Sequence, residues 1–193
     1  MLSPPVMKKR IYNQTSLFGP LYAYLVVLSP PDAVKGDIAK IKAGLNTIAD
    51  IGKRNLHSIA HITLVDKLTD DVLFPETIEE FIDDRQAFTI TIGGWDYFDH
   101  GHSVTVYLKV LDPEPVIGLM EAVKSTARSP HISLAKKVSH ETFNKLKSYL
   151  NNLNYSAQWI CTEVIVLKKL MSEKNLGFKD KIVIPLQIPK PST

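Results

Sequence analysis

His61-Ile62-Thr63-Leu64 and His131-Ile132-Ser133-Leu134 are two copies of one pattern: a histidine, an aliphatic residue, a hydroxyl residue and a second aliphatic residue. Side chains alternate between the two faces of a β-strand, so in each copy the histidine and the hydroxyl share one face. Each copy therefore predicts a strand that buries two aliphatic side chains and presents an imidazole beside a hydroxyl. If the two strands lie side by side, two imidazoles and two hydroxyls converge in one site.

The same order of elements leads to each copy. Aromatic and β-branched residues predict strands, and apolar residues at a spacing of three or four predict helices. Before the first copy we expect a strand at 22–28 and then a helix whose apolar face holds Ile38, Ile41, Leu45 and Ile48, leading to a strand at 59–65. Before the second copy we expect a strand at 104–110, a helix at 113–124 and a strand at 130–135. Two strand–helix–strand units that end in the same motif suggest an internal duplication.

The rest of the chain adds further elements to these two units. We expect a short helix around Ile78, a half-buried strand at 88–92, and a turn or loop at 93–101 that links this strand to the next as a hairpin. A helix at 139–153 and two late strands, 159–167 and 181–187, complete the pattern. We interpret residues 1–20 as an N-terminal extension and residues 21–193 as a single domain.

The composition is that of an ordinary globular protein. Hydrophobic residues make up 45% and charged residues 22% of the 193 residues, which argues against disorder. The longest apolar run, 21–28, is too short to cross a bilayer and no signal peptide opens the chain, so we expect a cytoplasmic protein without a membrane partner. The lone Cys161 lies among apolar residues, which favours a buried structural thiol. A net charge of +3 permits a phosphate-bearing ligand but does not predict a broad nucleic-acid-binding surface.

The two motifs supply the groups that cleavage of a phosphodiester requires. One group must take a proton from the attacking oxygen, and another must give a proton to the leaving oxygen. Histidine can do both, because its ordinary pKa of about 6.5 leaves either form accessible near neutral pH. The hydroxyls of Thr63 and Ser133 can donate hydrogen bonds to the non-bridging oxygens, where charge accumulates in the transition state. This chemistry needs no metal or cofactor. We assign His131 as the base and His61 as the acid of hydrolysis, with the roles exchanged in the reverse direction.

The repeated motif resembles that of the 2H phosphoesterase superfamily, which includes the LigT-like 2′-5′ RNA ligases and the cyclic phosphodiesterases. The run Ser129-Pro130-His131-Ile132-Ser133-Leu134-Ala135-Lys136 is similar to the family's Pro-His-x-Thr-Leu-Ala-Arg, with Ser133 in place of the commoner Thr and Lys136 in place of Arg. The resemblance extends over residues 21–186. It implies an α+β fold with two pseudo-symmetric lobes of antiparallel sheet, helices on the outside, and a central cleft that carries both motifs.

The resemblance also implies a function, namely a phosphoesterase acting on a 2′,3′-cyclic phosphate or a 2′-5′ phosphodiester of a nucleotide or RNA end. The catalytic residues would be His61, Thr63, His131 and Ser133. Three further residues are expected to bind substrate: Tyr24, Arg128 and Lys136. Lys136 lies an odd number of positions from His131, so only a strand end or a bulge would bring it to the same face. We expect the protein to act as a monomer.

Other patterns in the sequence are weaker. His57 and His61 are four residues apart, but Ser58 occupies the place of the metalloprotease glutamate and the segment predicts a strand. The sequence His100-Gly101-His102 is more typical of an exposed hairpin tip than of a metal site. Two alternatives stay open: the same fold acting on another small phosphodiester, such as ADP-ribose cyclic phosphate, or a nucleotide- or RNA-binding module without useful turnover.

Overall fold

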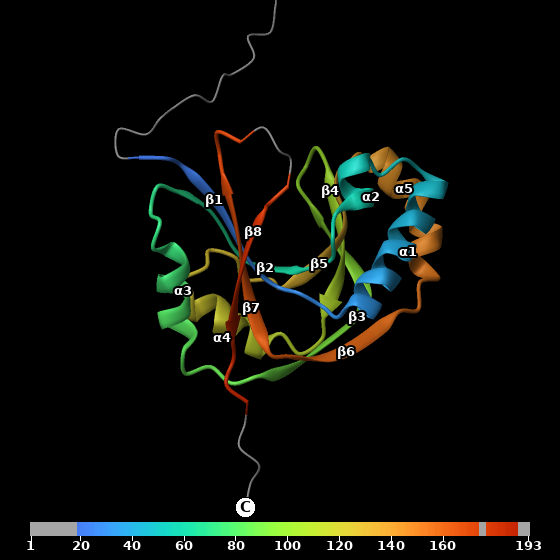
Figure 1. Cartoon of the computed structure of the whole chain (residues 1–193). Helices are drawn as coiled ribbons and strands as arrows, with labels where there is room; N and C mark the ends of the chain where they lie inside the picture. The colour runs from blue at the N-terminus through green and yellow to red at the C-terminus, as the bar shows by residue number, and fades with distance from the viewer. Residues whose placement is uncertain (1–18, 174–176, 189–193) are drawn as a thin grey trace, which may run out of the picture.

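Antiparallel pairing joins eight strands into one sheet, and five helices cover it, in a computed structural model that describes residues 19–173 and 177–188 (Figure 1). The strands are β1 Tyr22–Leu28, β2 Ile62–Thr69, β3 Phe88–Asp99, β4 Val104–Val110, β5 His131–Val138, β6 Ser156–Cys161, β7 Glu163–Leu170 and β8 Asp180–Pro185. The helices are α1 Asp32–Ile48, α2 Lys53–His57, α3 Phe74–Ile82, α4 Glu114–Ala122 and α5 His140–Asn151. The predicted α+β fold is confirmed. The expected extension, 1–20, lies almost wholly outside the described residues.

The sheet divides into two four-stranded halves. Its order is β6-β3-β4-β5-β2-β1-β7-β8, so the strands that carry the two motifs, β2 and β5, meet in the middle. These two strands pair in register at Ile62 and Ile132, the second residue of each motif. Reading outward from this pair, one lobe contains β2, β1, β7 and β8, and the other contains β5, β4, β3 and β6.

Two helices cross from one lobe to the other. Helix α1 follows β1 of the first lobe but packs against α5 and β5 of the second lobe. In the same way, α4 follows β4 of the second lobe but packs against α3 and β2 of the first. Figure 1 shows the result, with α1, α2 and α5 outside one lobe and α3 and α4 outside the other. The exchange is the same in both directions, as a duplicated unit would give.

The apolar face of α1 shows why this helix forms where the sequence predicts it. Ile38, Ile41 and Leu45 are all buried in the core. Ile48, expected on the same face, is 42% exposed because it is the last residue of the helix. Within the part of the chain that the structure describes, no helix is long and apolar enough to span a membrane. Cys161 is buried as expected, and burial raises the pKa of its thiol to about 11.

Two sequence-based expectations about loops and strands were wrong. Most of the expected loop at 93–101 is strand, because β3 continues to Asp99 through a bulge between Gly93 and Trp95. Gly94 has φ 61°, so the glycine pair makes a bulge instead of a turn. The single late strand expected at 159–167 is two strands, β6 and β7, which are interrupted at Thr162 and belong to different lobes.

Candidate active site

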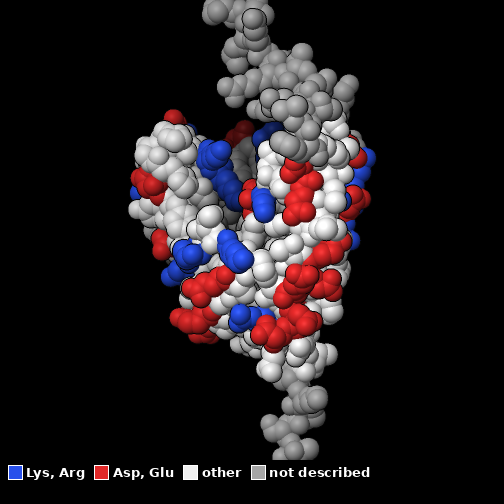
Figure 2. Space-filling view, turned by 90° about the vertical axis from the view of Figure 1, so that its left-hand side faces the viewer, with Lys and Arg blue, Asp and Glu red and all other residues white. Residues whose placement is uncertain are grey.

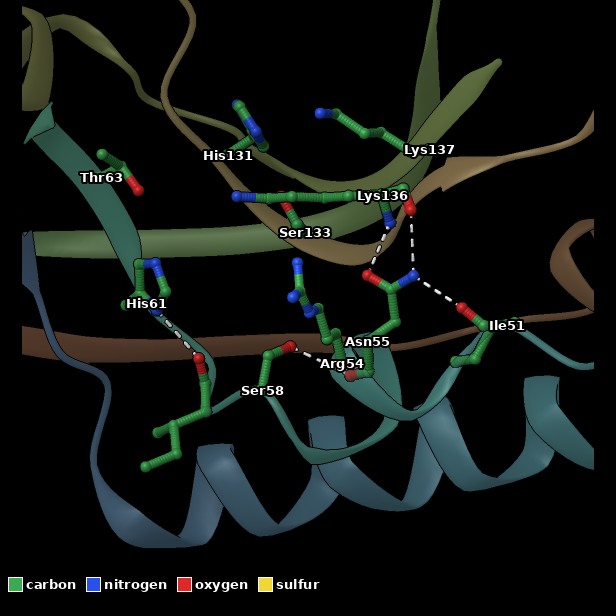
Figure 3. A pocket seen from close by; sticks show the side chains of 11 residues that line it. Ile51, Arg54, Asn55, Ser58, His61, Thr63, His131, Ser133, Lys136 and Lys137 are labelled. Atoms are coloured by element: carbon green, nitrogen blue, oxygen red, sulfur yellow. Dashed lines mark hydrogen bonds between the residues drawn. The ribbon is translucent and has the colours of Figure 1, made fainter. Parts of the chain in front are cut away.

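A cavity of about 490 Å³ lies where the two motif strands meet (Figure 3). His61, Thr63, His131 and Ser133 all line it, so the structure brings together the four residues that the sequence analysis selected. The other lining residues come from the segment before the first motif and from the far part of β5: Ile51, Arg54, Asn55, Ser58, Ile59, Lys136 and Lys137. A cavity of this size is large enough for a nucleotide.

The pairing of β2 with β5 sets how the four side chains face one another. The strands are antiparallel and pair at Ile62 and Ile132, so continuing the register places His61 beside Ser133 and Thr63 beside His131. The two imidazoles therefore occupy opposite corners of a square, and the two hydroxyls occupy the other corners. This is the arrangement that two proton-transfer groups on either side of one phosphorus require.

Both imidazole rings are oriented by the same kind of hydrogen bond, from Nδ1 to a backbone carbonyl. His61 Nδ1 lies 2.8 Å from the carbonyl oxygen of Ile59, and His131 Nδ1 lies 2.8 Å from that of Ser129, two residues earlier in each case. A carbonyl oxygen can only accept, so each Nδ1 carries a proton and donates it. In each neutral ring Nε2 is then the free nitrogen, with a lone pair that can take a proton from a ligand.

The backbone repeats the symmetry of the motifs. In its pairing with β1, strand β2 has an extra residue at Leu64, and in its pairing with β4, strand β5 has an extra residue at Leu134. Each bulge follows the hydroxyl residue directly, and both leucine side chains are buried. A bulge increases strand twist and re-aims the side chains next to it. The shared bulge and the shared carbonyl contact support the internal duplication that the sequence suggests.

A second bulge in β5 brings the expected lysine to the cavity. Ala135 and Val138 of β5 pair with Val106 and Val104 of β4, so β5 has one more residue than β4 between these pairs. Lys137, within this bulge, has a positive φ of 56°. The irregular backbone explains why Lys136 and its neighbour Lys137 both line the cavity although regular alternation would separate them. This is the bulge that the position of Lys136 in the sequence required.

Asn55 holds the second bulge in place. Its Nδ2 donates to the carbonyl oxygens of Lys136 (2.9 Å) and Ile51 (2.6 Å), and its Oδ1 accepts from the backbone N–H of Lys136 at 2.8 Å. The amide side chain thereby pairs with the backbone of β5 as a neighbouring strand would. Helix α2, which carries Asn55, is thus joined to the strand that carries the second motif.

The cavity is electropositive. Arg54, Lys136 and Lys137 line it, and no Asp or Glu of the described residues does. On the face shown in Figure 2, Lys and Arg side chains are interspersed with Asp and Glu side chains. The uniformly basic lining is therefore a local feature of the cavity, which agrees with the small net charge of the whole chain. It suits an anionic ligand such as a phosphate.

The same environment lowers the pKa of both histidines. Burial is the main cause for His61 and for His131, and the carbonyl that each Nδ1 contacts opposes it. The positive charge of Lys136 lowers both pKa values further, and His61 is also affected by Lys42 and His131. The lowered pKa values favour the neutral form of both rings near pH 7, and a bound phosphate would favour protonation of one of them.

Aromatic side chains support His131 from the hairpin of β3 and β4. The rings of Phe98 and Tyr107 stack on each other with centroids 4.3 Å apart. Their centroids lie 5.2 Å and 5.0 Å from that of His131, with the Phe98 ring edge-on to it. These contacts and the Ser129 carbonyl hold the ring of His131 from two directions.

Two of the expected substrate-binding residues lie elsewhere. Tyr24 is fully buried in the core, where its ring contacts Phe74 and its hydroxyl donates to the carbonyl of Asp71, because the face of β1 that carries it points into the first lobe. The guanidinium of Arg128 donates to the carbonyls of Ser125 (2.6 Å) and Ala127 (3.0 Å). It therefore braces its own loop, and it is not among the residues that line the cavity.

The sequence analysis missed the contribution of α2. This helix supplies Arg54 and Asn55 to the cavity, and Ser58 follows at its end. The helix has five residues, too few to show apolar periodicity in the sequence. The one signal of these residues in the sequence was a polar, basic run just before the first motif.

A second cavity of about 520 Å³, between β2, α3 and the loop after α4, shares Thr63 with the first. Among the described residues, no group of three or more His, Cys, Asp or Glu could hold a metal ion.

Comparisons with known proteins place the chain in context. Residues 30–172 match the family model for the 2′-5′ RNA ligase superfamily. In fold, the chain is similar to LigT of E. coli without ligand (16% identity, TM-score 0.58, covering 89% of this chain and 100% of that one) and complexed with 3′-AMP (18%, 0.57, 88% and 96%). It is also similar to Usb1 of Kluyveromyces marxianus with uridine monophosphate (15%, 0.52, 86% and 98%). No curated protein gives a significant match.

Proposed function

Since the chain belongs to the 2′-5′ RNA ligase superfamily of 2H phosphoesterases, we propose that it acts on a 2′,3′-cyclic phosphate or a 2′-5′ phosphodiester of a nucleotide or RNA end. One observation carries the proposal: His61 and His131, each held through Nδ1 by a backbone carbonyl, line one cavity together with Thr63 and Ser133. Fold relatives have been solved with 3′-AMP and with uridine monophosphate, which is consistent with a nucleotide ligand.

The proposed reaction is an in-line displacement at phosphorus. In hydrolysis of a cyclic phosphate, a water oxygen forms a bond to phosphorus while Nε2 of one neutral histidine accepts the proton of the water. The bond from phosphorus to one ribose oxygen breaks, and the other histidine, protonated once the phosphate is bound, gives its proton to that oxygen. The product is a phosphomonoester with one free ribose hydroxyl. When a ribose 5′-hydroxyl takes the place of water, the same steps form a 2′-5′ linkage.

The remaining groups of the cavity would stabilise the charge of the phosphate. Thr63 and Ser133 would donate hydrogen bonds to the non-bridging oxygens. Lys136 would add a positive charge close to both imidazoles, although a lysine cannot hold phosphate through two parallel hydrogen bonds as arginine does. We also propose that no metal takes part, because these hydroxyls and cations supply the charge stabilisation.

The test is turnover of a 2′,3′-cyclic nucleotide and of a 2′-5′ dinucleotide by the wild type and by three variants. His61→Ala and His131→Ala should each lose about a hundredfold or more in kcat, because each removes a proton-transfer group. The double variant should be little worse than either single one, since the two groups act as a unit. The matched control is His102→Ala, which removes an exposed histidine at the hairpin tip, outside the cavity, and should leave turnover unchanged.

The outcomes separate the alternatives. Full activity in folded His61→Ala or folded His131→Ala would refute the proposal. Nucleotide binding without any turnover by the wild type would identify a binding module. Turnover of another cyclic phosphodiester alone, such as ADP-ribose cyclic phosphate, would keep the mechanism and change the substrate.

A further inference from the structure

Lys42 is a buried lysine that the proposed mechanism does not use. It lies on the core-facing side of α1 among Ile38, Ile41 and Leu45, and 1% of its surface is exposed. No Asp or Glu in the described part of the chain forms a salt bridge with it. A buried ammonium is costly unless its donors are satisfied, so its partners have to explain its presence.

Both described hydrogen bonds of Lys42 go to one residue of the cavity wall. Its Nζ donates to the carbonyl oxygen of Ser58 at 2.8 Å and to Oγ of Ser58 at 2.7 Å. The Ser58 hydroxyl in turn donates to the carbonyl of Asn55 at 3.0 Å. The segment from the end of α2 to the first motif is therefore tied to the side of α1 at Ser58.

This tie lies next to the contact that orients a catalytic ring. Ile59 directly follows Ser58, and its carbonyl accepts from Nδ1 of His61. Figure 3 shows Ser58 and His61 on the same side of the cavity, with the bond from His61 to the backbone of the intervening segment drawn as a dashed line. A shift of Ser58 would move the Ile59 carbonyl and with it the ring of His61. In the described part of the chain, no lysine donates a hydrogen bond to Ser129 or Pro130, the residues before His131, where the Ser129 carbonyl contacts Nδ1 of that ring.

The charge of Lys42 acts on His61 as well. Basic groups face His61 from three elements: Lys42 on α1, Arg54 on α2, and Lys136 and the titratable ring of His131 on β5. Burial and the nearby Lys136 lower the pKa of Lys42 to about 8, so this lysine is still mostly charged at pH 7. Lys42 contributes to the low pKa of His61, whereas the positive charge that lowers the pKa of His131 comes from Lys136.

We propose that Lys42 is a positioning residue: it ties the loop before the first motif to α1 through Ser58, and thereby holds the Ile59 carbonyl that keeps His61 in its Nδ1–H form. The role in catalysis rests on the proposed function, whereas the effect on the ring of His61 does not.

The test compares Lys42→Met, which keeps most of the length of the side chain but removes its charge and donors, with Ile41→Val, a core change at the neighbouring position. Nitrogen chemical shifts and the pH titration of His61 are recorded by NMR on the protein without substrate. Lys42→Met should reduce the Nδ1–H form of His61 and shift its pKa upward, while the titration of His131 changes less. Lys42→Arg, which keeps charge and donors, should restore part of both signals. In turnover, Lys42→Met should lose about tenfold in kcat with little change in KM, as expected for a misplaced catalytic group.

The inference is overturned if Lys42→Met leaves the tautomer and the titration of His61 as in the wild type, or if it loses no more kcat than Ile41→Val. If Lys42→Met does not fold, Ser58→Ala takes its place. That variant removes one acceptor of the lysine and should alter the signals of His61 in the folded protein, and unchanged signals would also overturn the inference. The NMR result does not depend on turnover, so a protein that cleaves no phosphodiester would refute the proposed function without deciding the role of Lys42.

Discussion

Asn55→Ala should weaken both the fold and the site, because Asn55 joins α2 to the bulge of β5. The substitution removes two donated hydrogen bonds, to the carbonyls of Lys136 and Ile51, and one accepted from the N–H of Lys136. A hydrogen bond contributes about 1 kcal/mol net, and water can replace part of the loss because Asn55 is half-buried. We therefore expect the free energy of unfolding to fall by about 2 kcal/mol.

The effect on binding follows from the position of Lys136. Its ammonium can reach a bound phosphate only if the bulge holds its backbone in place, and a hydrogen bond to a charged group is worth about 1.5 kcal/mol or more. Partial loss of that contact should weaken the binding of a nucleotide monophosphate about tenfold. Asn55→Asp should be at least as harmful, since a carboxylate cannot donate to the two carbonyls and would also reduce the positive charge of the cavity.

Urea unfolding and calorimetric titration with 3′-AMP measure the two effects. The matched control is Asn152→Ala, which removes an exposed asparagine with one side-chain bond, from Nδ2 to the carbonyl of Ser148 at 2.8 Å. That control should change stability by less than about 0.5 kcal/mol and should not change binding. The reasoning is refuted if Asn55→Ala is as stable as the control and binds the nucleotide as tightly as the wild type.

Three further predictions concern the chemistry of the site. The folded protein lowers the pKa of His61 and His131, so the unfolded chain binds more protons below about pH 6.5. The free energy of unfolding, measured with urea, should therefore fall as the pH drops below about 6.5. In the double variant His61→Ala/His131→Ala it should depend less steeply on pH. Thr63→Ala and Ser133→Ala should each lower kcat about ten- to a hundredfold, and a loss as large as that of the histidine variants would contradict a supporting role. Turnover should survive exhaustive chelation; a loss that zinc or magnesium restores would contradict the proposed chemistry.

The sequence predicted those parts of the molecule in which local pattern and tertiary packing agree. The two tetrapeptides alternate apolar and polar residues, and the strands that carry them lie at the centre of the sheet with Ile62 and Ile132 paired and buried. The apolar spacing along α1 likewise predicted its buried face. In these segments, periodicity alone identifies the element and the side that enters the core.

Other features depend on contacts between segments that are distant in the sequence. Gly93 and Gly94 form a bulge instead of a turn, because the strand continues along its partner β4. The position of Lys136 depends on Asn55, 81 residues away in the chain. Lys42 lies on the apolar face of α1, whereas the helical pattern alone would suggest a solvent-exposed lysine. Its burial is explained only by its hydrogen bonds to Ser58, which the sequence does not reveal. Tyr24, expected to bind substrate, instead lies in the core, and its hydroxyl bonds to the carbonyl of Asp71, 47 residues away in the chain.

The exchange of α1 and α4 means that the lobes do not correspond to the first and second halves of the chain. The lobe built on β2 and β1 takes α4, β7 and β8 from the later part of the sequence, and the lobe built on β5 and β4 takes α1 and α2 from the earlier part. Cleavage at any one peptide bond between α3 and β3 would therefore give two fragments that each lack part of both lobes. Separating the lobes would have to stretch the connections from β1 to α1 and from β4 to α4, or draw these helices off the strands they cover. The spacing of the two histidines is thus determined by the packing of the entire molecule as well as by the pair of strands that carries them.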